Sequence, residues 1–209
     1  PGDKVMMSGP YGDFHPNLTS GKEMIWIGGG AGMAPLRAQI MYMTKTLHCR
    51  DREMHFFYGA RSLTEAFFLE DFWELEKEYP NFHFHLSLDR PDPKADAAGV
   101  KYYTGFAVNC IRDTYLKDHD APEDCEYYLC GPPMLIKTVT DYLDSLGVEP
   151  ESIMYDNFGF GLLWFVCSFV WFISVGSVPY LSMAGTDYQC CQPQYGDFPF
   201  TDDLLQIIT

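Results

Sequence analysis

The chain has 209 residues, of which 47% are hydrophobic and 16% aromatic, so it can bury a sizeable core in one large domain or one and a half. Its 29 acidic residues outnumber its 14 lysines and arginines, which gives a net charge of −15. This balance argues against nucleic acid as a partner. An anionic ligand would have to be held by local N–H groups and a few basic side chains.

The seven cysteines are odd in number and scattered, and no C-x-x-C pair occurs. Cys125 and Cys130 have no histidine at the spacing of a zinc site, and His55, His83 and His85 read as packed or surface residues of strands. We therefore expect no metal site and a reducing compartment. The sequence has no signal peptide and begins with proline, so we expect it to start inside a longer protein.

The first twenty residues read as the end of another domain. Lys4–Ser8 resembles a short strand and is followed by a turn rich in glycine and proline, residues 9–14. A strand without a partner is not stable, so we expect residues 1–20 to be the last strand and turn of a preceding β-barrel. Asn17–Lys22 is read as the linker to a second domain, residues 21–159.

A glycine-dense turn at residues 28–35 organises that second domain. The apolar run Met24–Gly28 enters it, and a stretch with helical periodicity, Met33–Leu47, leaves it. Glycines bring a backbone close to a ligand, and the N-terminus of a helix favours an anion. The spacing departs from G-x-G-x-x-G. The turn alone therefore leaves open both a pyrophosphate site and a tight connection without a ligand.

The remaining pattern alternates strands with helices, which predicts an α/β fold with a doubly wound, parallel, five-stranded sheet. Such sheets bind ligands at the carboxyl ends of their strands. The other expected strands are Met54–Tyr58, Phe82–Leu88, Glu126–Cys130 and Ser152–Tyr155. The other expected helices are Phe67–Tyr79, Gly105–Tyr115 and Met134–Leu146, and Pro91–Val100 is expected to be a polar loop.

The composition changes after Gly159. Phe160–Val178 contains no charged residue, and no lysine or arginine follows Lys137. That run is long enough to span a bilayer, yet it lacks basic flanking residues. Three interpretations of residues 160–209 stay open: a membrane or interfacial segment, a non-native tail from a frameshift or read-through, and a buried helix.

Four motifs in order resemble the pyridine-nucleotide half of the ferredoxin-NADP reductase superfamily. They are Gly9–Phe14, Gly28–Pro35, Tyr58–Ser62 and Cys130–Met134. The stretch Tyr115–Tyr128 is particularly similar to the F subunits of sodium-translocating NADH:quinone reductases. The resemblance covers residue 1 to about residue 159.

The resemblance implies that a nicotinamide stacks on a flavin and passes it a hydride. It implies catalytic roles for Cys130, beside the nicotinamide, and for Phe158, which would cover the flavin ring. Taken by themselves, Cys130 is a small buried hydrophobe and Phe158 an ordinary core residue. The implied cofactor-binding residues are Gly9, Pro10, Gly12, Gly28, Gly29, Gly30, Ala31, Gly32, Met33, Ala34, Pro35, Gly59, Ala60, Arg61, Asp89, Gly131, Pro132, Pro133 and Met134.

Charge at the expected site favours NADH over NADPH. A 2′-phosphate needs cations at the ends of the second and third strands. Arg61 is one such cation, but Asp89 would repel the phosphate. Arg61 can also be read as a solvated charge that pairs with Glu65.

The resemblance also implies what this chain does not contain. FAD would be bound mostly by an upstream barrel, and a [2Fe-2S] cluster and a membrane helix would lie in an N-terminal part. The expected setting is a membrane NADH:quinone reductase complex, with this domain on the cytoplasmic face of a bacterial inner membrane. The alternatives are a reductase component of an oxygenase and a catalytically silent nucleotide-binding fragment.

Overall fold

A computed structural model describes residues 12–157 of the chain. These residues lie within Pro1–Gly159, the first of two units into which the chain divides. The expectations for the strand Lys4–Ser8, for Gly9 and Pro10, for Phe158 and for residues 160–209 fall outside the described residues. Within the described part, no helix is long and apolar enough to cross a membrane.

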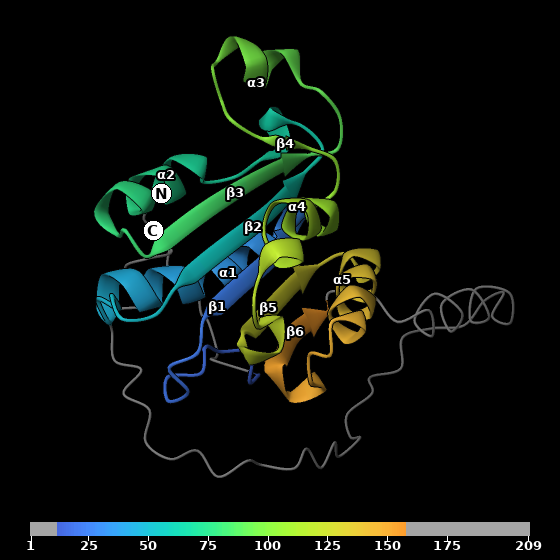
Figure 1. Cartoon of the computed structure of the whole chain (residues 1–209). Coiled ribbons are helices and arrows are strands. Elements are labelled where there is room, and N and C mark those ends of the chain that lie inside the picture. The colour runs from blue at the N-terminus through green and yellow to red at the C-terminus, as the bar shows by residue number, and fades with distance from the viewer. Residues whose placement is uncertain (1–11, 158–209) are drawn as a thin grey trace, which may run out of the picture. The chain divides into compact units, whose positions relative to one another are not determined.

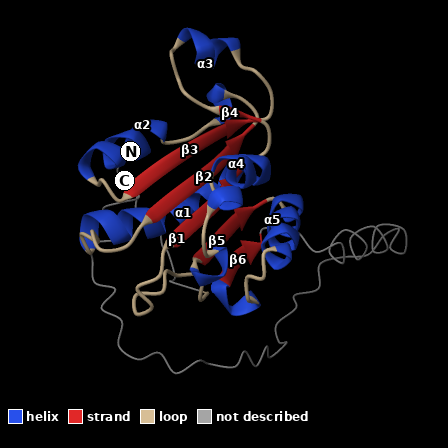
Figure 2. Ribbon diagram, in the orientation of Figure 1, coloured by secondary structure: helices blue, strands red, loops and turns tan. Residues whose placement is uncertain are grey.

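The fold is built on one six-stranded parallel sheet with the order β4-β3-β2-β1-β5-β6 (Figures 1 and 2). The strands are β1 (Met24–Gly29), β2 (Met54–Ala60), β3 (Phe82–Leu88), β4 (Tyr103–Thr104), β5 (Glu126–Gly131) and β6 (Ile153–Asn157). The predicted parallel α/β sheet is confirmed, but five strands is wrong by one. The additional strand, β4, is an edge strand of two residues, too short for any periodicity to show in the sequence.

Helices connect the strands, as the sequence predicts. They are α1 (Met33–Met41), which continues as a π-helix (Tyr42–Thr46), α2 (Leu69–Glu78), α3 (Pro93–Ala97), α4 (Ala107–Thr114) and α5 (Pro133–Ser145). The predicted helix over Phe67–Tyr79 begins two residues late. Phe68 has a left-handed backbone conformation (φ 55°) that precludes a helical turn there, so Phe67 and Phe68 are exposed and do not join the apolar face.

The short helix α3 corrects the expectation of a polar loop at Pro91–Val100. The Asp92 carboxylate accepts hydrogen bonds from the backbone N–H of Lys94 (2.9 Å) and of Ala95 (3.4 Å) and so caps the helix. It also accepts one from the N–H of Leu63 (2.7 Å) after β2. One aspartate therefore starts α3 and ties it to the neighbouring loop.

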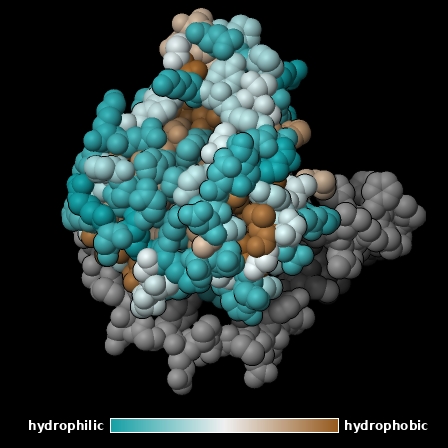
Figure 3. All heavy atoms as spheres, viewed as in Figure 1, coloured by the Kyte–Doolittle hydropathy of each residue, from teal (hydrophilic) through white to brown (hydrophobic). Residues whose placement is uncertain are grey.

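Alternate side chains of each strand face opposite helical layers. Ile27 and Leu129 point into a core that contains Ile111 of α4 and Val139 of α5. On the other face, the Trp26 indole donates to the Gln39 amide of α1 (2.9 Å), and α2 packs on the same side through its aromatic residues. The outer surface in the view of Figure 3 is mostly hydrophilic, in keeping with the acidic composition.

A buried ion pair fixes the linker that precedes β1. The Arg52 guanidinium lies 2.8 Å from the Glu126 carboxylate, and both side chains are buried. Arg52 also donates to the backbone carbonyls of Asn17 and Lys22 (both 2.6 Å). The Asn17 amide donates to Glu126 (2.9 Å), and the Tyr128 hydroxyl joins the same network. The predicted linker at residues 17–22 is thus held by β2 and β5.

The backbone of Gly32 lies directly against the backbone of β5. A Cβ at this position would overlap the carbonyl group of Cys130 and lie 2.7 Å from the nitrogen of Gly131. Backbone atoms in a sheet cannot move aside as a flexible side chain can. Only glycine therefore allows α1 to begin this close to β5.

The first prediction concerns this contact. Gly32→Ala should lower the free energy of unfolding by about 3 kcal/mol or more, because overpacking against backbone cannot be relieved by a rotamer change. The measurement is urea denaturation followed by circular dichroism. Gly30→Asn is the matched control, since the space around Gly30 is open and asparagine tolerates its positive φ of 56°. An equal loss in both variants would contradict the explanation.

The second prediction concerns the buried ion pair. Arg52→Met should destabilise the fold by about 3–5 kcal/mol, because Glu126 is left buried without its partner. Replacing both members, as in Arg52→Met with Glu126→Leu, should recover part of that loss. Lys137→Met, which breaks an exposed pair with Asp141, should cost less than about 1 kcal/mol. If Arg52→Met unfolds at the same urea concentration as Lys137→Met, the pair does not stabilise the domain.

Candidate nucleotide-binding site

The chain reverses its direction of sheet growth between β1 and β5. From β1 it proceeds outward through β2, β3 and β4, and it then crosses to the other side of β1 to form β5 and β6. The loops that leave β1 and β5 therefore diverge to opposite faces and leave a crevice at the carboxyl ends of these strands. Open α/β sheets bind ligands at such a switch point.

The glycine turn of the sequence lies in this crevice. β1 ends at Gly29, residues 30–32 form one turn of 3₁₀-helix, and α1 follows. Gly30 is exposed with open space around it, and the small residues Ala31 and Ala34 are exposed beside it. The first turn of α1 carries no acidic residue. An uncrowded helix N-terminus with free access and no negative side chain suits a phosphate group.

Not every expected residue of the motif is accessible. Gly28 and Gly29 are buried, and a Cβ on them would lie 2.7 Å from Leu36 Cδ1 and 2.9 Å from Leu135 Cδ1 respectively. Met33 is also buried. These three residues pack α1 and α5 onto the sheet and leave ligand contact to Gly30, Ala31 and Ala34, with Gly32 and Pro35 shaping the turn.

The end of β5 forms the opposite wall of the crevice. Gly131 has a φ of 153°, and a Cβ there would lie 3.0 Å from the Gly29 carbonyl oxygen. Pro132 and Pro133 are exposed where α5 begins, and the Met134 side chain is 69% exposed. The Cys-Gly-Pro-Pro-Met motif therefore faces the glycine turn across a narrow gap. The structure brings together the two motifs that the sequence separates by about one hundred residues.

Cys130 is the last residue of β5 whose side chain is fully buried. Burial, and to a smaller extent the nearby Asp156 carboxylate, raises the pKa of its thiol to about 12. The thiol is therefore neutral at physiological pH and is no nucleophile. Its position at the switch point fits the expected one, but a ligand reaches its sulfur only when the atoms that cover it shift.

Arg61 and Asp89 follow β2 and β3 at the same edge of the sheet. Ala60 pairs with Leu88 in register, and the backbone N–H of Asp89 donates to the Ala60 carbonyl oxygen (3.1 Å). Both charged side chains are exposed. Gly59 lies just before them and admits α4, since a Cβ there would come within 3.2 Å of Ala107 Cβ. The charges expected to select the nucleotide thus lie beside each other, one strand further from the glycine turn.

One exposed residue at this edge was not expected from the sequence. Phe106, which precedes α4, is 62% exposed, and the neighbouring Gly105 N–H donates to the Leu88 carbonyl oxygen at the end of β3. An aromatic ring in solvent beside the candidate site can stack on a planar ligand. The sequence signal was only a phenylalanine at a helix start, which helical periodicity assigns to the core. Of the remaining expected residues, Gly12 is exposed with a φ of 85°.

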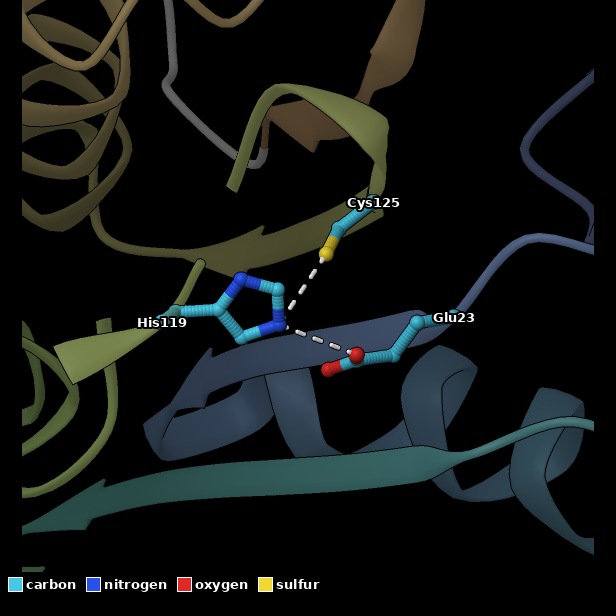
Figure 4. Close-up of side chains that lie close together, drawn as sticks. All are labelled: Glu23, His119 and Cys125. Carbon is cyan, nitrogen blue, oxygen red and sulfur yellow. Dashed lines mark hydrogen bonds and ion pairs between the residues drawn. The ribbon is translucent and has the colours of Figure 1, made fainter. Parts of the chain in front are cut away.

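Two clusters with metal-ligating side chains lie at the other end of the sheet. In the first, His119 Nε2 is 3.1 Å from a Glu23 carboxylate oxygen and 3.7 Å from Cys125 Sγ (Figure 4). The Ala121 N–H donates to His119 Nδ1 (3.2 Å), so the ring proton is on Nε2 and is donated to Glu23. Burial, followed by the Glu23 charge, raises the pKa of Cys125 to about 12. The groups satisfy one another, and the nitrogen that faces them carries a proton.

The second cluster consists of Glu53, His55 and His83, whose ligand atoms lie within 4.8 Å of one another. Histidines 55 and 83 are direct partners in the register of β2 and β3. Burial and the neighbouring histidines lower the pKa of His55 to about 3, and burial and His83 lower the pKa of His85 to about 4. The sequence analysis treats these histidines as separate packed or surface residues. The structure corrects the separation and places them together.

Comparison with known proteins agrees with the fold and the site. Residues 26–141 match the family model of the oxidoreductase NAD-binding domain. The F subunit of the Na⁺-translocating NADH-quinone reductase of Psychrobacter cryohalolentis is 53% identical over 159 residues, which is 76% of this chain and 38% of the relative. The protein of the same name from Yersinia pseudotuberculosis is 52% identical over the same shares. The chain thus spans well under half the length of these relatives.

Solved structures show the same architecture. The Amycolatopsis cytochrome P450 reductase GcoB is 29% identical, with a TM-score of 0.59 over 72% of this chain and 42% of that one. The FAD/NAD-binding domain of a nitric oxide dioxygenase from Vibrio cholerae is similar in fold, with a TM-score of 0.57 over 72% of this chain and 56% of that one. The matched family model spans both walls of the crevice, and the chain therefore belongs to the family of oxidoreductase NAD-binding domains.

Proposed function

We propose that this chain is the NADH-binding part of a flavin-dependent NADH:quinone oxidoreductase of the sodium-translocating type. The observation that carries the proposal is the open N-terminus of α1, which faces the Cys-Gly-Pro-Pro-Met turn across the switch point of the sheet. The identity of 53% to an F subunit supports the type of reductase. Because that similarity covers 38% of the relative, the reaction belongs to a longer assembly.

The residues of the crevice bind and orient the nucleotide. The N–H groups of residues 30–32 and the dipole of α1 hold the pyrophosphate, and the lack of side chains there lets the phosphates approach. When bound, NADH supplies a hydride from its C4 atom, and FAD accepts it at N5. Pro132 and Pro133 keep the rim of the β5 loop rigid. The chain therefore contributes position and orientation to the reaction.

The Cys130 thiol orients the nicotinamide ring. With a pKa raised to about 12 by burial, it is a neutral group that presents a polarisable sulfur without adding charge to the site. A sulfur at the end of β5 limits how the ring lies against the flavin. Phe158, which would cover the flavin, lies outside the described residues, and its role stays a prediction.

The setting follows from the relatives. Their printed name describes one component of a sodium-translocating quinone reductase, which implies partner subunits in a bacterial membrane. We propose that the domain works at the cytoplasmic face of that membrane. FAD would be held mainly by a barrel that precedes residue 21, and a [2Fe-2S] cluster would lie in an N-terminal part of the complete protein.

A second function is a reductase component of an oxygenase. The solved relatives include a cytochrome P450 reductase and a ferredoxin reductase in carbazole 1,9a-dioxygenase. Their identities of 29% and 22% are far below the 53% of the F subunits. The quinone reductase is therefore the better supported of the two.

The third prediction tests nucleotide binding and its selectivity. Isothermal titration of the chain should show that NADH binds more tightly than NADPH, because the Asp89 carboxylate repels a 2′-phosphate. Asp89→Asn should raise the affinity for NADPH about tenfold and leave that for NADH within about twofold. Asp118→Asn removes the same charge at the other end of the sheet and should change neither. Failure of the chain to bind either nucleotide would contradict the proposed function.

The fourth prediction tests the thiol. In a polypeptide that joins this chain to a flavin-binding barrel, Cys130→Ala should slow flavin reduction by NADH about tenfold or more. The reason is that hydride transfer depends steeply on orientation. The dissociation constant of NADH should change much less. Stopped-flow absorbance separates the two quantities.

Cys49→Ala is the control for loss of a buried thiol, since Cys49 precedes β2 at the opposite end of the sheet. It should reduce flavin at the unaltered rate. Equal rates in the Cys130 variant and the unaltered protein would remove the thiol from the reaction.

A further inference from the structure

The cluster of Glu53, His55 and His83 has the composition of a metal site and no part in nucleotide binding. Glu53 precedes β2, and the two histidines pair across β2 and β3 near their N-terminal ends. Residues 59–61 and Asp89, which face the nucleotide, lie at the other ends of the same strands. The function of the cluster is therefore independent of the proposed reductase activity.

The distances are close to those that a metal ion requires. His83 Nε2 lies 2.7 Å from a Glu53 carboxylate oxygen, and His55 Nε2 lies 4.0 Å from the same oxygen. Ligand atoms about 2.1 Å from a tetrahedral metal are about 3.4 Å apart. Shifts of less than about 1 Å would bring these contacts to that separation. Glu53 is exposed and can make such a movement.

His55 is held so that one nitrogen is available. Its Nδ1 is 3.3 Å from His85 Nε2, and its ring packs on the Tyr115 ring at 4.1 Å between centroids. When Nδ1 carries the proton and donates it to His85, Nε2 presents a lone pair toward Glu53 and His83. At 4.0 Å from Glu53, that nitrogen makes no hydrogen bond with it. A histidine that is 94% buried thus presents one unpaired nitrogen to the cluster.

The opposite tautomer is the less favourable one. If His85 Nε2 carried the proton, His55 Nε2 would carry one too, with its hydrogen-bond acceptor 4.0 Å away. A buried N–H without an acceptor is costly. A second histidine that fixes the tautomer of the first is how outer-shell groups orient metal ligands.

The cluster is also accessible. The side chains of His83 and Glu53 are 40% and 46% exposed, so an ion can enter from solvent and complete its coordination with water. Two imidazoles and one carboxylate suit zinc, cobalt, nickel or copper, and not calcium or magnesium, which take oxygen ligands. We propose that Glu53, His55 and His83 bind a divalent transition-metal ion that links β2 to β3.

The Glu23, His119 and Cys125 cluster is the internal comparison (Figure 4). It also contains a histidine nitrogen beside a carboxylate. There the Ala121 N–H occupies Nδ1, so Nε2 must keep its proton and has no lone pair for a metal. The two clusters differ in what lies behind the histidine, a donor in one and a histidine acceptor in the other. Of these two clusters, the one on β2 and β3 is set up for an ion.

The fifth prediction tests the site with cobalt and zinc ions added to the full chain under reducing conditions. Cobalt should bind with a visible ligand-field spectrum that lacks a thiolate charge-transfer band, since no cysteine belongs to the site. Zinc should raise the unfolding temperature, because it binds the folded state alone. His83→Gln should weaken binding about tenfold or more and abolish the thermal shift.

His119→Gln is the matched control and should bind cobalt as the unaltered chain does. Glu53→Gln provides a second variant at an exposed position, and a circular dichroism spectrum checks that each variant is folded. A thiolate band, loss of binding in His119→Gln, unchanged binding in His83→Gln, or no binding at all would each overturn the proposal. Because no nucleotide is present, these outcomes are separate from those that test NADH binding.

Discussion

The contact between the backbones of Gly32 and Cys130 determines how the site is assembled. It places the first turn of α1 directly against the end of β5, without a side chain between them. The helix N-terminus and the buried thiol therefore share one crevice. Any residue with a Cβ at position 32 would push the helix away from the strand and separate the two groups that the proposed reaction needs together.

The two ends of the sheet have different physical characters. The carboxyl ends of the strands carry glycines, prolines and exposed apolar residues such as Phe106 and Met134, which suit a flat ligand and its phosphates. The amino ends carry interacting charged groups and imidazoles, including the Arg52–Glu126 pair and the two histidine clusters. One end is open for recognition, and the other ties segments distant in the sequence to each other.

The sequence predicts those features that depend on local patterns. Alternation of apolar runs and amphipathic stretches is enough for the parallel sheet, because each strand and helix spans several residues of its period. The strand of two residues, β4, and the helix α3 escape prediction, since they are shorter than the patterns that reveal longer elements, and α3 depends on the Asp92 carboxylate. Phe68 shows a different limit, because its left-handed backbone overrides an apolar pattern that is otherwise helical.

The site is predictable to the degree that it resides in motifs. Gly30, Ala31 and the Cys130–Met134 turn are identified from residue types and their order, whereas the buried state of Gly28 and Met33 depends on which helix packs above them. The histidine pair requires the register of β2 on β3, which no spacing in the chain specifies. Separation along the sequence and proximity in the sheet are independent quantities.

The network around Arg52 has a consequence for the order in which the domain forms. Arg52 and Glu126 are 74 residues apart, and Asn17 and Glu126 are 109 apart. Contacts that close such long loops form late, because the loss of chain entropy precedes the gain. During synthesis, Arg52 emerges well before its carboxylate partner exists. Residues 17–22 can therefore take their final path only once β5 has been made and has joined β1, so the first part of the domain in sequence is among the last to become ordered.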